Sequence, residues 1–155
     1  MNNQELIKEA FQKAILGFND QILSNHENWF NHVINLPEKL QVVYTIGVLN
    51  QQVLNGGFEQ YFFNPYGQFA YLTVQNLKLI DAYAIENLLD KAIIMVNKEN
   101  LEPAEFGKKI FNREIDLINN FDKELNENLE KLDKEYYSFK DDLENLMANY
   151  LLKVS

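Results

Sequence analysis

The sequence predicts an all-α protein, and three observations lead to this fold class. Apolar residues recur at spacings of three and four along most of the chain, which is the period of an amphipathic helix. No segment alternates polar and apolar residues between hairpin-type turns. Neither glycine nor proline occurs after Gly107, so the last third of the chain has no strong helix breaker. We therefore expect seven to nine helices in one compact domain over residues 1–155.

Three helices are predicted in the first third of the chain. The first covers residues 4–18. Ser24 and Glu27 have the spacing of a capping box, which predicts the start of a second helix. Pro37 suits the first turn of a third helix. That helix would end at Gly56, because a glycine in the left-handed conformation is a common helix C-terminus.

The second half of the chain also reads as helical. Residues 68–80 and 83–97 carry apolar positions at helical spacing, and Pro103 is expected to open the next helix. From Phe111 onward apolar residues follow at heptad-like spacing, and Asp122 interrupts the pattern. We expect three consecutive helices there rather than one long coiled coil.

One stretch, residues 55–67, is compositionally unusual. It reads NGGFEQYFFNPYG and contains three of the six glycines in the chain. Seven of the twenty aromatic residues fall between Phe58 and Tyr71, and aromatic side chains bury more area than most others, so this stretch should lie in the core. Proline disfavours a helical conformation in the residue before it, so Pro65 should end the short aromatic helix. The proposed structural motif comprises Asn55, Gly56, Gly57, Phe58, Tyr61, Phe62, Phe63, Asn64 and Gly67.

Catalytic, cofactor and metal sites find little support in the sequence. The glycine pair matches neither a phosphate-binding loop nor a dinucleotide fingerprint, and residues 40–77 lack the Lys or Arg that base stacking requires. Glu59, the only charge in that span, is a candidate acid, but a carboxylate near a helix start also has a purely structural explanation. His26 and His32 are six residues apart and point to different sides of a helix. We expect no catalytic residue, no cofactor and no metal.

The chain is acidic, with a formal net charge of −9 and a pI of about 4.7. Such a protein should repel nucleic acid and attract basic partners. Most of the charge lies between Glu114 and Glu144, where eleven acidic residues accompany four lysines. The chain has no cysteine, no leader-like start and no membrane-length apolar run, so we expect a cytoplasmic protein that does not bind membranes.

Two segments resemble the DNA-mimic protein nineteen family. These are NGGFEQYFFNPYG and the C-terminal LDKEYYSFKDDLENLMANYL, and the resemblance covers residues 36–155, with the helices of residues 1–35 packed on that part. The resemblance implies an all-helical fold. It also implies an acidic, dimeric protein that imitates duplex DNA and occupies the DNA-binding surface of a transcription regulator. The glycine-aromatic motif is architectural in this family, so no functional residue carries over by position.

The residues themselves are compatible with such mimicry. Carboxylates three or four positions apart on a helix lie about 5–6 Å apart, near the spacing of neighbouring phosphates. Lys131 and Lys134 lie close in sequence to the acidic residues between Glu114 and Glu144 and would partly neutralise their charge. The leading hypothesis is a non-enzymatic module that binds a basic DNA-binding regulator. The alternatives are an immunity-type inhibitor of a cationic nuclease, an ordinary solvated acidic face, and a ligand-binding or enzymatic pocket under Phe58–Phe69. The predicted partner-binding residues are Glu114, Asp116, Glu124, Glu127, Glu130, Asp133 and Glu135.

Overall fold

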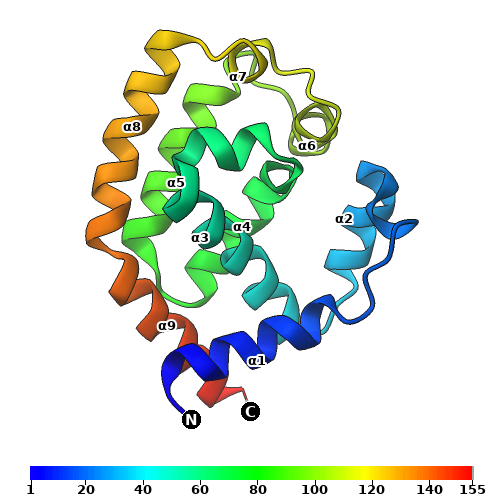
Figure 1. Ribbon diagram of the computed structural model, residues 1–155, viewed down its shortest axis with the longest axis vertical. Helices are drawn as coiled ribbons and strands as arrows, with labels where there is room; N and C mark the ends of the chain where they lie inside the picture. The colour runs from blue at the N-terminus through cyan, green and yellow to red at the C-terminus, as the bar shows by residue number, and fades with distance from the viewer. Residues whose placement is uncertain (155) are drawn as a thin grey trace.

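The computed structural model describes residues 1–154, which form helices and turns and contain no β-strand (Figure 1). The all-α prediction is confirmed, and the number of helices falls in the expected range. No helix within these residues is long and apolar enough to cross a membrane. The α-helices are α1 (Asn3–Ile15), α2 (His26–Ile34), α3 (Glu38–Phe63), α4 (Ala70–Leu79), α5 (Tyr83–Val96), α6 (Pro103–Phe111), α7 (Asp116–Asn119), α8 (Lys123–Ser138) and α9 (Lys140–Lys153), and the 3-10 helices are η1 (Ile22–Ser24) and η2 (Pro65–Phe69).

Helix α3 runs through the middle of the molecule (Figure 1). Residues 42–46 of this helix are all buried, so this part of it is covered around its whole circumference rather than along one stripe. A helix of this kind has to be covered by neighbours on every side. Helices α1, α4, α7, α8 and α9 all contact it.

The outer helices form a ring around α3. Helices α8 and α9 follow one another along one edge of the molecule, and α1 crosses its base beside α9 (Figure 1). Helix α8 packs on both α3 and α5, while α2 packs against α6 and η2. A second, smaller core lies under α2, where the Trp29 indole N–H donates a buried hydrogen bond of 3.1 Å to the Tyr44 hydroxyl.

The helix starts agree only in part with the sequence-based predictions. The capping box at Ser24 and Glu27 is wrong: Asn25 is the N-cap of α2, and its side chain accepts a hydrogen bond of 2.8 Å from the Asn28 N–H. The Ser24 hydroxyl donates to a backbone carbonyl instead. Asp122 interrupts the apolar pattern because it is the N-cap of α8, where its side-chain oxygen accepts a hydrogen bond from the Leu125 N–H. The three helices expected after Phe111 are confirmed as α7, α8 and α9.

Candidate functional site

Helix α3 is broken at its two adjacent glycines. Gly56 has φ −147° and ψ 18°, and Gly57 has φ +77° and ψ −177°, so the helix stops and restarts at Phe58. The sequence-based assignment of the positive φ to Gly56 is therefore wrong, because Gly57 adopts it. The conformation of Gly57 is open essentially only to glycine. The break sets the direction in which the second half of α3 leaves the first.

The restarted half of α3 is capped by a side chain from α8. The Phe58 N–H donates a hydrogen bond of 2.8 Å to Asp133 Oδ1, which lies 75 positions later in the chain. A Cβ atom on Gly57 would collide with Asp133 Oδ2 and lie 2.8 Å from Asp133 Cγ. The approach of the carboxylate therefore depends on the glycine: Asp133 can reach the backbone only because position 57 has no side chain.

Two further carboxylates lie beside Asp133. Burial raises the pKa of Asp133; the Phe58 N–H opposes this, and the charges of Glu130 and Glu59 raise the pKa further. Burial also raises the pKa of Glu59, with a second contribution from Glu130. We call Glu59, Glu130 and Asp133 the carboxylate cluster. Burial is the larger cause of the raised pKa of Glu59 and of Asp133, and the like charge of Glu130 adds to both at the junction of α3 and α8.

No cation neutralises the carboxylate cluster within residues 1–154. The ion pairs in this part of the chain join Lys13 to Glu9, Lys78 to Glu86, and Lys123 to Glu127. Lys131 and Lys134 lie on α8, yet neither reaches a carboxylate at ion-pair distance. The partial neutralisation expected from the sequence therefore does not take the form of direct contacts.

Amide side chains bridge the break in α3. Gln52 Oε1 accepts hydrogen bonds from Gln60 Nε2 at 2.9 Å and from Asn64 Nδ2 at 2.7 Å. Asn55 Nδ2 donates to Gln60 Oε1 at 3.0 Å. These bonds tie the helix before the glycines to the helix after them with uncharged groups.

The predicted acidic residues of α8 do not share a single face. Glu124, Glu127 and Glu130 are exposed, whereas Asp133 is half-buried and turned toward α3. Glu124 and Asp133 are separated by about two and a half helical turns, so their side chains leave α8 on opposite sides. The remaining predicted residues, Glu114, Asp116 and Glu135, are exposed as well.

The structure adds Glu59 to this surface. The sequence interpretation kept Glu59 apart from the acidic residues of α8, because 71 positions separate it from Glu130. The two carboxylates nevertheless interact across the α3–α8 junction. Glu59 stands out in the sequence as the sole charged residue between positions 40 and 77, but this does not indicate which residues lie near it in the fold.

The aromatic part of the motif lies in the core, as predicted. Phe58, Tyr61 and Phe62 are at most 1% exposed, and the Phe58 ring packs edge-to-face on the Tyr136 ring with centroids 5.8 Å apart. Cavities of about 440, 320 and 460 Å³ lie elsewhere, and none of these three is lined by a residue between Phe58 and Phe69. The pocket considered under these rings is therefore not one of these three cavities.

The two histidines have separate surroundings. His26 Nδ1 lies 2.8 Å from Gln68 Oε1, and the His32 ring meets the edge of the Phe18 ring with centroids 4.8 Å apart. In the part of the chain that the structure describes, no group of three or more His, Asp or Glu side chains is arranged to hold a metal ion. His26 is held by its contact with Gln68, whereas His32 Nε2 is buried without a hydrogen-bond partner among the described residues.

Comparison with known proteins identifies the family. The family described as DMP19-like protein matches residues 34–154, which is more than half of the chain and includes both halves of α3, the carboxylate cluster and α9. No curated protein and no solved structure gives a significant match. The match agrees with the resemblance in the glycine-aromatic and C-terminal segments. The chain belongs to the DMP19-like protein family.

Proposed function

We propose that this protein is a non-enzymatic binding module that offers its acidic surface to a basic, DNA-binding regulator in place of DNA. The observation that carries the proposal is the carboxylate cluster, in which Glu59, Glu130 and Asp133 lie together without an ion-pair partner among residues 1–154. The match to the DMP19-like family supports the same conclusion.

The cluster is better explained by binding than by folding. Burial and neighbouring like charges disfavour the ionised forms of Glu59 and Asp133, so at neutral pH the ionisation of these two groups makes the folded chain less stable than it would be with them protonated. Lysines are present on α8 but do not offset the repulsion by contact. Groups with perturbed ionisation at the surface are more frequent at functional sites than elsewhere. A cationic partner would relieve the repulsion when it binds.

The arrangement has features in common with a phosphate backbone. Glu127 and Glu130 are exposed three residues apart on α8, a spacing of about 5–6 Å. Glu59 adds a carboxylate from a different helix, which broadens the charge beyond a single line. DNA-binding proteins make most of their hydrogen bonds to phosphate and sugar, largely from Lys, Arg and polar groups. The phosphate-binding surface of such a protein should bind appropriately placed carboxylates as well.

A triple variant tests the proposal. Glu59→Gln, Glu127→Gln and Glu130→Gln remove three charges and leave the Asp133 cap of Phe58 in place. The matched control removes three exposed acids elsewhere, through Glu99→Gln, Glu102→Gln and Glu105→Gln. Each protein is immobilised and exposed to native cytosol, and the retained proteins are identified and purified. The affinity of each is then measured against salt concentration.

A basic DNA-binding protein should be retained by the parent and the control but not by the triple variant. Its binding should weaken with salt and be competed by its DNA, since both ligands would occupy one cationic surface. Retention of a nuclease whose activity is blocked would favour the immunity-type alternative. Simultaneous binding of DNA and this protein to the regulator, or equal binding by parent and triple variant, would refute the proposal.

A further inference from the structure

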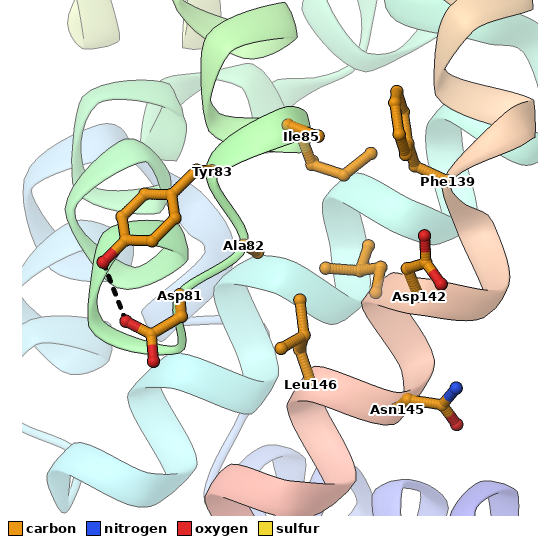
Figure 2. A pocket seen from close by; sticks show the side chains of 10 residues that line it. Asp81, Ala82, Tyr83, Ile85, Phe139, Asp142, Asn145 and Leu146 are labelled. Carbon is orange, nitrogen blue, oxygen red and sulfur yellow. Dashed lines mark hydrogen bonds between the residues drawn. The ribbon is translucent and has the colours of Figure 1, made fainter.

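A surface cavity lies apart from the carboxylate cluster, between the α4–α5 turn and the junction of α8 with α9. Its volume is about 440 Å³. Figure 2 shows Ala82 and Ile85 on one side, and Phe139 and Leu146 on the other. Ala82 and Ile85 are 2% exposed, so the inner wall is continuous with the hydrophobic core, whereas Ala84 at the rim is exposed. The cavity can therefore receive an apolar group from outside.

The charged residues that line this cavity are both acidic. They are Asp81 on the α4–α5 turn and Asp142 in the first turn of α9, and no Lys, Arg or His lines the cavity. Asp81 is held in place by its own turn, where φ is +64°, and by the Tyr83 hydroxyl, which donates a hydrogen bond of 2.8 Å to Asp81 Oδ1 (Figure 2). Asp142 is exposed and forms no ion pair within residues 1–154.

We propose that this cavity binds one large apolar side chain of a partner protein, in a segment where Lys or Arg flanks that side chain. A buried aromatic side chain contributes about 150–250 Å² of contact area, and such anchors in pockets dominate many interfaces. The flanking cations would meet Asp81 and Asp142, so the charge of the segment complements that of the rim. The residues involved are distinct from Glu59, Glu130 and Asp133, and this inference goes beyond the proposed function.

Three short peptides probe the cavity without knowledge of the partner. Acetyl-Lys-Trp-Lys-amide carries the anchor with flanking cations, and acetyl-Gln-Trp-Gln-amide and acetyl-Glu-Trp-Glu-amide carry the same anchor with neutral or acidic flanks. Each is titrated into the isotope-labelled protein, and amide NMR spectra are recorded. The lysine peptide should shift the amides of residues 81–85 and 139–146 and bind more tightly than the glutamine peptide. The glutamate peptide should bind most weakly.

Two variants locate the contact. Asp142→Asn should weaken the lysine peptide by about two- to fivefold, in the range of one exposed ion pair. Asp141→Asn removes the same charge from the neighbouring exposed position, which does not line the cavity, and should have a smaller effect. Ala84→Arg places a cation at the exposed rim and should abolish the shifts.

Several outcomes would overturn the proposal. These are the absence of shifts at residues 81–85 and 139–146, equal binding of the lysine and glutamate peptides, or equal effects of the two aspartate variants. Shifts of the same amides on dilution of the protein alone would show that a second copy fills the cavity instead. Because the comparison among peptides uses the parent protein, a variant that folds poorly does not remove the test. A failure here leaves the result of the Glu59, Glu127 and Glu130 variants unaffected.

Discussion

Replacing Gly57 with alanine should strongly destabilise the protein, and the structure gives the size of the effect. Forcing a residue with a Cβ into the conformation of Gly57 costs about 1–3 kcal/mol. The new Cβ would also displace the Asp133 carboxylate, which breaks its hydrogen bond to the Phe58 N–H and costs about another 1.5–3 kcal/mol. The free energy of unfolding should therefore fall by about 2.5–6 kcal/mol, from a typical total of about 5–15 kcal/mol.

Gly56→Ala is the matched control for this prediction. Gly56 has a negative φ, but its Cβ would meet the Gln60 side chain and lie 2.9 Å from Gln60 Cβ. Relieving this contact should disturb the hydrogen bonds of Gln60 to Asn55 and Gln52, so the loss should be about 1–2 kcal/mol. Urea unfolding followed by circular dichroism measures both values. In an Asp133→Ala background the cost of Gly57→Ala should shrink to its backbone part, because the colliding carboxylate is gone. Equal losses for the two glycine variants, or an unchanged cost in that background, would refute the reasoning.

Three further predictions concern the core and the acidic surface. Phe62→Ala should lower the free energy of unfolding by about 3–5 kcal/mol, because Phe62 is 1% exposed; a loss below 1 kcal/mol in urea unfolding would contradict the packing described. Tyr44→Phe should lower the free energy of unfolding by about 1–3 kcal/mol, because the Trp29 indole N–H loses its acceptor. Phe11→Leu changes a ring that stacks on Tyr44 but leaves this hydrogen bond in place, and calorimetry can compare the unfolding of the two variants. Because the pKa of Asp133 is raised on folding, the folded chain binds more protons than the unfolded chain above the ordinary carboxyl range. Stability should therefore fall as pH rises from the ordinary carboxyl range through the raised pKa of Asp133, and Glu130→Gln should reduce this fall; a Tm difference unchanged by Glu130→Gln would count against the like-charge contribution.

The positions of the helices could be predicted from local sequence alone. Apolar spacing indicates where α5 and α8 bury their stripes, and Pro103 and Pro65 mark a helix start and a helix end through their own geometry. These features depend on residues within a few positions of each other. The all-α class and the three C-terminal helices followed from the same local information.

Features set by contacts between distant segments could not be predicted in this way. Either glycine of the pair could have adopted the positive φ, and the choice of Gly57 is tied to the approach of Asp133 from α8. The same contact turns Asp133 inward, although its sequence spacing matches that of Glu127 and Glu130. Glu59 joins the cluster for the same reason. The acidic character of the surface could thus be predicted from composition, but the residues that form the carboxylate cluster could not.

The hydrogen bond between Phe58 and Asp133 makes one backbone amide a spectroscopic reporter of the acidic surface. The Phe58 proton is bonded to a carboxylate oxygen, so its chemical shift should follow the protonation of Asp133. A cation that approaches Glu59 and Glu130 from outside would lower the pKa of Asp133, and the titration midpoint of this resonance would move to lower pH. The Phe58 amide resonance would then report the binding of a charged partner to the exposed carboxylates, with no label at the interface.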